Sequence, residues 1–519
     1  MAGVRPQASA PSAGQLVAPE RAPKVVVIGG GIAGVSAAVV LAERGVPVVI
    51  CEAAGQLGGR LGSRPHTLPD GTGQWVDHGF HGFFRQYYNW RRILRRIGRE
   101  ATLLRPLGSY PVISATWPAE EFDRLPPAPP LSLLALTLRS PSLRLRELAR
   151  ADLALGLNLL RFDPDRTYAR LDQVSAEQFL AALRLSDRAR AMLFNVFAHS
   201  FFNDPGAMSA AELVAMFHFF FLGNPEGLGM DAPRADYQSA IWTPLSRYLE
   251  QRSARIGTGT PIASLDRGPA GEWHVSTGSG EVLTADEVVL ATDAGAAARI
   301  LSASPGITSG DPRLASVAAE PRTGPPYAVA RYWLDGDVDP VRAQFTSIAD
   351  PGLLDSVTLY HRVEAGARQW HERTGGAVAE LHAYACPSGV SPAGLGAAML
   401  AELQVLWPEA ARLNLVDQYC HAGADAAGFP VGAHGTTPGV RTGVRGLTLA
   451  GDWVAAPFPS ALMERSASTG ILAANTILAA RGYGTEPLWS VPSRGMLAGR
   501  RVPRSTSATP AGVLLAYPA

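Results

Sequence analysis

The feature that most constrains the fold is a glycine-rich turn that joins a short apolar run to an alanine-rich segment. Residues 25–28 are all β-branched, which is typical of a buried parallel strand. Residues 35–44 are followed by Gly45, a pattern that predicts a helix ending at a C-terminal glycine. A second apolar run, residues 47–51, ends at Glu52. Together these segments predict a βαβ unit.

The three glycines of the turn, Gly29, Gly31 and Gly34, have the spacing G-x-G-x-x-G. The first allows a tight turn, the second lets the backbone approach a diphosphate, and the third lets helix and strand pack closely. The diphosphate would lie at the helix N-terminus, where free N–H groups and the helix dipole favour negative charge. Glu52 follows Gly34 by 18 residues, near the roughly 20 expected for a carboxylate that binds ribose. The alternative is a packing helix without a ligand. The predicted dinucleotide-binding residues here are Gly29, Gly31, Ile32, Ala33, Gly34 and Glu52.

The composition argues against several other classes of function. The 519 residues include 46 Lys plus Arg and 45 Asp plus Glu, and this balance argues against a nucleic acid partner. Lys24 is the single lysine, so neither a P-loop nor a lysine imine site is expected. The three cysteines form no CxxC pair, and His371-Glu372 lacks the second histidine of a zinc protease motif. We therefore predict no metal site.

The ends and the apolar stretches indicate a chain without a membrane span. Residues 1–23 contain no apolar run of signal-peptide length, so we expect a disordered leader and a cytoplasmic protein. The longest apolar stretches are far shorter than the roughly 20 residues that span a bilayer.

A resemblance to a known superfamily indicates which dinucleotide is bound. Residues 52–60, Glu-Ala-Ala-Gly-Gln-Leu-Gly-Gly-Arg, resemble the extended FAD motif of the amine oxidase and carotenoid desaturase superfamily. Residues 449–452, Leu-Ala-Gly-Asp, resemble its distal motif. The resemblance implies an α/β fold: a Rossmann-type FAD-binding domain of the amine oxidase and phytoene desaturase type, with an inserted α+β substrate domain. The implied segments are a leader (1–23), the first FAD-binding segment (24–100), a mainly helical substrate- and membrane-facing region (101–245), the middle FAD-binding segment (246–300), a substrate domain with a β-sheet (301–440), the last FAD-binding segment (441–483) and an extended tail (484–519).

The same resemblance implies roles for particular residues around FAD. Glu52 would hold the adenosine ribose, and the Gly-Gly-Arg turn would lie along the diphosphate. Asp452 would reach the ribityl and phosphate region, although it could instead be a helix-capping turn residue. The further implied cofactor-binding residues are Gly58, Gly59, Arg60, Gly79, Phe80, Ile262, Gly451, Asp452 and Met463.

Residues 77–89, 196–205 and 216–233 narrow the resemblance to the isorenieratene synthase family of carotenoid φ-ring synthases, which are flavin-dependent β-carotene desaturase/methyltransferases. The resemblance implies a lipophilic carotenoid substrate, desaturation of a β-ionone ring, and a 1,2-methyl shift that gives an aromatic end group. The alternatives are another carotenoid or phytoene desaturase or isomerase, a flavin amine oxidase, and a non-catalytic lipid- or prenyl-binding protein of this fold.

Such a reaction passes through a ring cation, so it calls for aromatic faces and a group that handles a proton. Our first candidate for the proton is His81, the second is His78 and the third is Glu464, each of which could instead be a hydrogen-bonded structural residue. Arg60 and Arg85 could contact phosphate or flavin, and Arg85 could equally pair with an acid. The aromatic candidates, for which ordinary core packing is the alternative, are Phe80, Phe83, Phe84, Tyr87, Phe217 and Phe219.

Carotenoids reside in bilayers, so a transient contact with the membrane surface is expected. Residues 131–160 combine repeated leucines with Arg139, Arg144, Arg146 and Arg150. Such a segment could lie in the interface with its arginines at the headgroups, as a peripheral protein on the inner face of the cell membrane. The alternative is an ordinary helical layer of the substrate domain.

Overall fold

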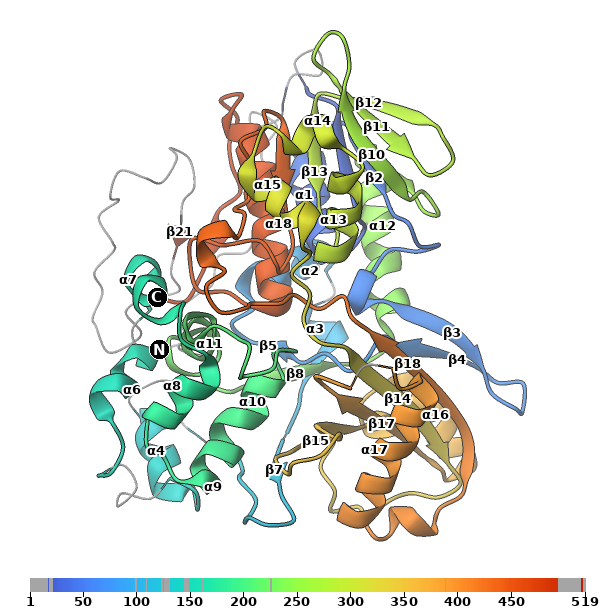
Figure 1. Ribbon diagram of the computed structural model, residues 1–519. Coiled ribbons are helices and arrows are strands. Elements are labelled where there is room, and N and C mark those ends of the chain that lie inside the picture. Colours follow the sequence, from blue (N-terminus) through green and yellow to red (C-terminus); the bar gives the residue numbers. More distant parts are fainter. Residues whose placement is uncertain are drawn as a thin grey trace.

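A computed structural model describes residues 17, 22–98, 100–108, 110–122, 125, 131–143, 149–160, 162–224, 226–387, 389–492 and 515–516. Most of the expected leader and most of the tail beyond residue 492 lie outside these residues. The described chain forms an upper region around a parallel sheet, with a helical region and a second sheet below it (Figure 1).

The upper region is built on a five-stranded parallel sheet in the order β19-β13-β1-β2-β9. Its strands come from three separate stretches of the chain. One long segment is inserted between β2 and β9 and another between β13 and β19, and each leaves this sheet and returns to it. The strands are β1 (Val25–Ile28), β2 (Val48–Cys51), β9 (Arg255–Gly257), β13 (Glu287–Leu290) and β19 (Leu447–Leu449).

Two long helices pack together beside this sheet. They are α1 (Ile32–Ala42) and α18 (Leu462–Ala479). A Cβ built on Gly470 of α18 would lie 2.1 Å from the carbonyl oxygen of Ala33, so only glycine permits this approach. The same region contains α12 (Thr243–Glu250), α13 (Ala294–Ser302), α14 (Pro305–Thr308), α15 (Pro312–Ala319) and the antiparallel strands β10 (Ile262–Arg267), β11 (Trp273–Thr277) and β12 (Val282–Ala285).

The second sheet has six strands in the order β18-β14-β17-β16-β15-β7. Alternate residues of its central strands, such as Ala330 and Leu381, form an apolar cluster with Leu395 and Met399 of the covering helix α17 (Pro392–Leu406). The side chains between them point to the opposite face. The strands are β7 (Val112–Ile113), β14 (Tyr327–Leu334), β15 (Phe345–Ile348), β16 (Ser356–Leu359), β17 (Ala377–Ala383) and β18 (Leu415–Gly423), and α16 (Ala365–Thr374) lies nearby.

The described residues include three π-helical turns, two in the helical region and one that leads directly into α12 of the upper region; such turns are rare and often occur at functional sites. These turns are η4 (Ala191–Asn195), η5 (His218–Leu222) and η6 (Gln238–Trp242). The helices of the region are α4 (Leu131–Arg139), α6 (Leu153–Leu160), α7 (Pro164–Leu171), α8 (Ala176–Ala182), α9 (Asp187–Arg190), α10 (Val196–His199) and α11 (Ala210–Phe217).

Short elements connect these parts. They are α2 (Tyr88–Arg96), α3 (Glu100–Leu103), β3 (Ser63–Thr67), β4 (Gly73–Asp77), β5 (Phe83–Phe84), β6 (Leu104–Pro106), β8 (Met230–Pro233), β20 (Leu488–Trp489), β21 (Leu515–Ala516) and the 3-10 turns η3 (Gly59–Leu61), η7 (Tyr360–Arg362), η8 (Ala410–Arg412) and η9 (His434–Thr436).

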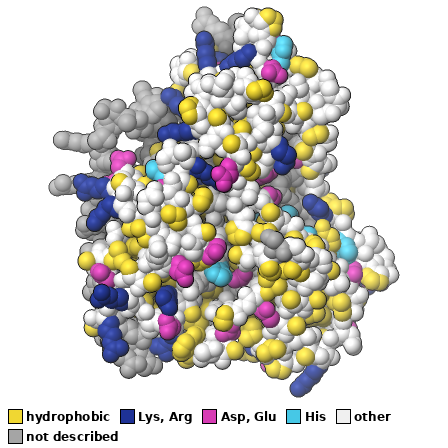
Figure 2. Space-filling model, in the orientation of Figure 1, with side chains coloured by type: hydrophobic (Ala, Val, Ile, Leu, Met, Phe, Trp, Pro, Cys, Tyr) yellow, Lys and Arg dark blue, Asp and Glu magenta, His cyan; other side chains and the backbone are white. Residues whose placement is uncertain are grey.

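The first part of the tail is anchored to the upper region. The carboxylate of Glu486 pairs with Arg44, Arg92 and Arg96, and Leu488 is fully buried. Within the described part of the chain, no helix combines the length and apolar character needed to cross a bilayer. On the face shown in Figure 2, basic and acidic side chains are interspersed.

Candidate functional site

A cavity of about 700 Å³ lies at the carboxyl ends of the parallel strands, the edge at which open α/β sheets bind ligands. Gly29, Glu52, Ala291 and Gly451 follow β1, β2, β13 and β19 and line it. The sequence-predicted residues that line this cavity are Gly29, Gly31, Ile32, Ala33, Glu52, Gly58, Gly59, Arg60, His78, Gly79, Phe80, His81, Ile262, Gly451, Asp452 and Met463.

The glycine turn has the geometry that a diphosphate site requires. Gly29 has φ +106°, and a Cβ there would lie 2.6 Å from the carbonyl oxygen of Ala291. A Cβ on Gly31 would meet nothing within 4 Å and would project into the open space at the start of α1. The N-cap of α1 is Gly31 itself and makes no side-chain hydrogen bond, so the first N–H groups of the helix stay available to a phosphate.

Gly34 does not line the cavity and has a packing role. A Cβ at this position would lie 1.9 Å from the carbonyl oxygen of Gly29 and 3.1 Å from Cγ1 of Val27. The third glycine of the motif therefore lets α1 pack closely against β1.

Glu52 holds the turn in place with its carboxylate. Oε2 accepts the N–H of Gly30 at 2.6 Å, and Oε1 accepts the N–H of Ala54 at 2.8 Å. A carboxylate has about four acceptor sites, so it can still accept hydroxyl groups from a ribose.

A charged pair also lines the cavity. Nη2 of Arg60 is 2.7 Å from Oδ1 of Asp452, and both residues line the cavity. Burial acts to lower the pKa of Arg60, but the adjacent carboxylate of Asp452 acts to raise it. The net pKa lies above its usual value, so the guanidinium stays charged. The N-cap of α18 is Ala461 without a side-chain hydrogen bond, so Asp452 is not the cap of this helix. Leu462 and Met463, the first residues of α18, line the cavity.

These residues fit the FAD that the superfamily resemblance implies. The open space at Gly31, the uncapped starts of α1 and α18, the cation of Arg60 and the acceptors of Glu52 match a long anionic dinucleotide. Their positions as binding residues remain predictions.

The structure places the two candidate histidines at the cavity wall. Nδ1 of His81 is 2.7 Å from the carbonyl oxygen of Gly79, and Nε2 of His78 is 2.6 Å from the Tyr327 hydroxyl. Burial lowers the pKa of His81 to about 4 and that of His78 to about 2. Both imidazoles are therefore neutral at neutral pH.

Glu464 does not line the cavity, which is a correction to its proposed role in proton transfer. Its carboxylate accepts the backbone N–H groups of Asn89 and Trp90 at 2.8 and 3.1 Å, so it caps the start of α2. It is 1% exposed, and burial raises its pKa to about 8. Arg85 also lies outside the cavity lining, 3.8 Å from Asp231.

The aromatic wall of the cavity differs in part from the expectation. Phe80, Phe84 and Tyr87 line it, whereas Phe83, Phe217 and Phe219 are buried in the core and do not. The π-helical turn η5, which contains Phe219, Phe220 and Phe221, shifts the helical register in this segment. The aromatic lining residues that the sequence did not indicate are Tyr110, Phe197, Phe201, Phe202, Phe220, Phe221, Tyr327, Phe345 and Tyr384.

His382 also lines the cavity, from β17. The sequence reasoning missed it. The signal that could have revealed it is Glu380-x-His382 within an otherwise apolar strand, because residues two apart share one face.

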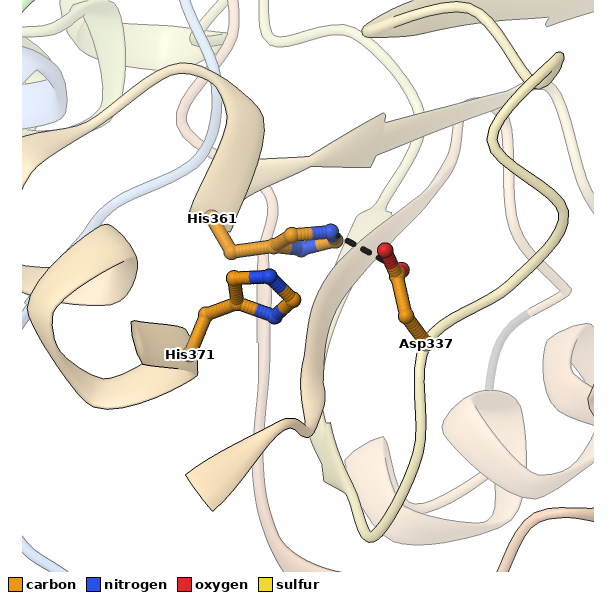
Figure 3. Close-up of side chains that lie close together, drawn as sticks. All are labelled: Asp337, His361 and His371. Carbon is orange, nitrogen blue, oxygen red and sulfur yellow. Dashed lines mark ion pairs between the residues drawn. The ribbon is translucent and has the colours of Figure 1, made fainter. Parts of the chain in front are cut away.

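One group elsewhere resembles a metal site, although we predicted none. Asp337, His361 and His371 have potential ligand atoms within 4.8 Å of one another (Figure 3). The guanidinium of Arg362 already contacts both carboxylate oxygens of Asp337 at 3.2 Å. Val378 N–H donates to Nδ1 of His361 at 3.1 Å, which directs the Nε2 proton toward Asp337. The carboxylate is thus already neutralised, and we assign no metal site here.

Comparisons with known proteins agree with this geometry. Residues 32–478 match the family model described as flavin containing amine oxidoreductase. The chain is 41% identical to a carotenoid phi-ring synthase of Streptomyces griseus, over 91% of each chain. It is 28% identical to a carotenoid phi-ring synthase of Chlorobaculum tepidum, over 92% of this chain and 91% of that protein.

Solved structures share the fold at low sequence identity. A cyclohexylamine oxidase from Brevibacterium oxydans superposes with a TM-score of 0.63 at 18% identity, covering 88% of this chain and 98% of that one. A putrescine oxidase gives a TM-score of 0.62 at 18% identity, covering 88% and 99%. The chain therefore belongs to the family of flavin-containing amine oxidoreductases and is an FAD-dependent oxidoreductase.

Proposed function

We propose that this oxidoreductase acts on a carotenoid, and that it converts a β-ionone end ring into an aromatic ring with a 1,2-methyl shift. The carotenoid phi-ring synthase of Streptomyces griseus supports this proposal, because the two chains are 41% identical over 91% of each. A zeta-carotene desaturase of Zea mays, 26% identical over 54% of this chain and 51% of that protein, supports the wider class of carotenoid oxidation.

The observation that carries the proposal is the make-up of the cavity. It is lined by the glycine turn, Glu52 and Arg60 together with many aromatic side chains. Such a wall excludes water from a polyene ring, and each aromatic face stabilises a nearby cation by about 0.5–2 kcal/mol. The wall therefore suits both an apolar ring and the positive charge that develops on it.

The chemistry divides between the cofactor and the chain. Bound FAD would supply the hydride acceptor for the oxidation of the ring carbon. A methyl group of the resulting cation then moves to the neighbouring carbon, and the loss of a proton forms a ring double bond. A second oxidation completes the aromatic ring. The chain orients the ring against the cofactor, stabilises its positive charge with the aromatic wall, excludes water and accepts the protons.

The proposal is tested by expression in a host that makes β-carotene, followed by pigment analysis. We expect aromatic carotenoids with the wild-type chain and unchanged β-carotene with Gly31→Asp, which places a carboxylate at the open diphosphate position. The control is Asp70→Asn on the exposed β3-β4 turn, which should behave as wild type. Unchanged β-carotene alongside FAD-loaded wild-type protein would refute the proposal.

We also propose that α4 touches the membrane from which the substrate is taken, as part of a peripheral attachment on the cytoplasmic side. Leu131, Leu134 and Leu138 are 61%, 55% and 66% exposed, and their spacing places them on one side of the helix. Leu136 packs inward against the cluster that also contacts Phe197, a cavity-lining residue. Arg139 and Arg150 are exposed at the surface, whereas Arg144 and Arg146 lie outside the described residues.

Vesicle flotation tests this contact. Leu134→Asp combined with Leu138→Asp should reduce binding to vesicles of anionic phospholipid. Val341→Asp is the control, because Val341 is 79% exposed in the loop between β14 and β15 of the six-stranded sheet. Equal flotation of wild type and the double variant would contradict the proposal, and cell fractionation reports the compartment.

A further inference from the structure

The face of the six-stranded sheet that is turned away from α17 carries an ordered set of polar side chains. Arg331 of β14 is the direct cross-strand partner of Glu380 on β17, and Val329 is the partner of His382. Because residues two apart share a face, all four side chains lie on the same side of the sheet. Val329 and His382 line the cavity, so this face is part of its wall.

A buried ion pair lies behind that wall. Oε2 of Glu380 is 2.6 Å from Nη2 and 2.9 Å from Nε of Arg331, and both side chains are almost fully buried. The guanidinium carbon of Arg331 stacks 3.6 Å from the ring centre of Tyr360. Burial acts to raise the pKa of Glu380, but Arg331 and a hydrogen bond from His382 hold it at about 2, so the carboxylate is ionised.

The carboxylate fixes which nitrogen of His382 can act as a base. Oε1 of Glu380 is 2.8 Å from Nε2 of His382, and because an ionised carboxylate can only accept, the Nε2–H group donates this hydrogen bond. The lone pair is then on Nδ1, which lies 3.2 Å from the hydroxyl of Tyr384, another cavity-lining residue. A carboxylate that orients an imidazole and stabilises its protonated form is the arrangement that activates catalytic histidines.

The pair also contacts Gly79 and Phe80, two of the residues predicted to bind the cofactor. The N–H of Phe80 donates to Oε1 of Glu380 at 2.6 Å. A Cβ on Gly79 would lie 3.2 Å from Cε1 of His382, so the imidazole lies directly against this glycine.

We propose that His382, with the Tyr384 hydroxyl beside it, accepts the proton that the substrate loses after hydride transfer. Glu380 and Arg331 are positioning residues that act through His382. The inference rests on the proposed oxidation of a carotenoid and names a residue for its proton step.

The step balances for each of the two oxidations. One C–H bond gives a hydride, with both its electrons, to the FAD. The electron pair of a second C–H bond, next to the cationic carbon, becomes the new double bond. Its proton goes to Nδ1 of His382 and afterwards to solvent.

His382 is better suited to this step than the other two histidines at the wall. His81 bonds to a backbone carbonyl and His78 to a phenol, and burial lowers the pKa of both. A carboxylate stabilises an imidazolium more strongly than either of these partners.

The test is an anaerobic single turnover of FAD-loaded protein with carotenoid. The loss of flavin absorbance measures the rate, and pigment analysis identifies the product. His382→Gln should slow the reaction by about 100- to 10,000-fold, the usual contribution of a general base. The matched control is His66→Gln, because His66 also pairs with a carboxylate, Asp417 at 2.8 Å, but does not line the cavity. FAD content and thermal unfolding of each variant report the fold, and His382→Asn replaces His382→Gln if that variant loses FAD.

The pH profile separates a proton acceptor from a merely structural residue. The wild-type rate should fall at acidic pH, because a protonated His382 cannot accept a proton, and this acid limb should be absent in His382→Gln. The titratable and charged groups that face His382 from the packed elements are Glu380, Arg331, Tyr384, Asp355, His81 and His421.

The outcomes distinguish this inference from the proposed function. Every desaturation removes a hydride and a proton, so the variant is measured with whichever carotenoid the wild type oxidises. If the wild type oxidises ζ-carotene but not β-carotene, the aromatisation proposal fails and the role of His382 is tested on ζ-carotene. A wild-type rate and an unchanged acid limb in His382→Gln overturn the inference. FAD-loaded wild type that oxidises neither carotenoid overturns both.

Discussion

The replacement Glu52→Gln tests the position of the dinucleotide most specifically. In the wild type, the Glu52 carboxylate accepts hydrogen bonds from two backbone N–H groups at 2.6 and 2.8 Å, and Glu52 lines the cavity beside the glycine turn. Glutamine keeps the shape of the side chain but removes the charge and turns one acceptor into an NH₂ group. One backbone N–H then loses its acceptor, which costs about 1–3 kcal/mol of folding stability.

The effect on the cofactor follows from the hydroxyl groups of the ribose. A hydrogen bond to a charged acceptor contributes about 1.5–3 kcal/mol, which corresponds to about a 10- to 160-fold change in Kd. We expect Glu52→Gln to raise the Kd of FAD by this factor. The measurement is a titration of apoprotein with FAD in which the flavin fluorescence is followed. FMN lacks the adenosine half, so its affinity should not change.

The control is Glu281→Gln. Glu281 is exposed and lies close enough to the end of β2 to contribute to the raised pKa of the Cys51 thiol, after the larger effect of burial. Its replacement removes the same charge from the same region without touching the cavity. Wild-type FAD affinity in Glu52→Gln, or an equal loss for FAD and FMN, would refute the placement of the ribose at Glu52.

Three further predictions concern the other parts of the site. Gly31→Ala should keep nearly wild-type thermal stability, because its Cβ would meet nothing within 4 Å. It should bind FAD more weakly in the same titration, because this Cβ would occupy the open space predicted to hold the diphosphate. A destabilised apoprotein would contradict this prediction. Gly34→Ala should instead destabilise the protein by at least about 2 kcal/mol in urea unfolding, because its Cβ would lie 1.9 Å from the Gly29 oxygen; wild-type stability would be inconsistent with that packing. The raised pKa of Glu464, about 8 against 4.5, means that the folded state keeps a proton that the unfolded state releases, so stability falls as pH rises between these values. Glu464→Gln should remove this pH dependence, which amounts to at most about 1.4 kcal/mol per pH unit. The same change of thermal stability with pH in both proteins, between the two pKa values, would disprove the prediction.

The nucleotide-binding half could be predicted from the sequence because its signals are local. The β-branched run, the three glycines and Glu52 occupy consecutive positions, and the structure has β1, α1 and β2 in that order. The helix begins at Ile32, within the glycine motif and three residues earlier than the predicted start at residue 35.

The rest of the site depends on packing that local patterns do not encode. Glu464 lies near the start of a long helix, and whether it faces the cavity or α2 depends on how that helix is rotated in the core. Phe220 and Phe221 reach the cavity, while Phe217 and Phe219 do not, because a π-helical turn changes the register. His382 acquires its chemistry only because β14 brings Arg331 opposite Glu380, a pairing of residues 49 positions apart.

The most direct test of the account follows the methyl group itself. FAD-loaded protein is incubated with β-carotene whose geminal ring methyl groups carry deuterium, and the product is examined by NMR and mass spectrometry. We predict an aromatic end ring in which one labelled methyl has moved to the adjacent carbon. A product that keeps both labelled methyl groups on the same carbon, formed by fully FAD-loaded enzyme, would contradict the account.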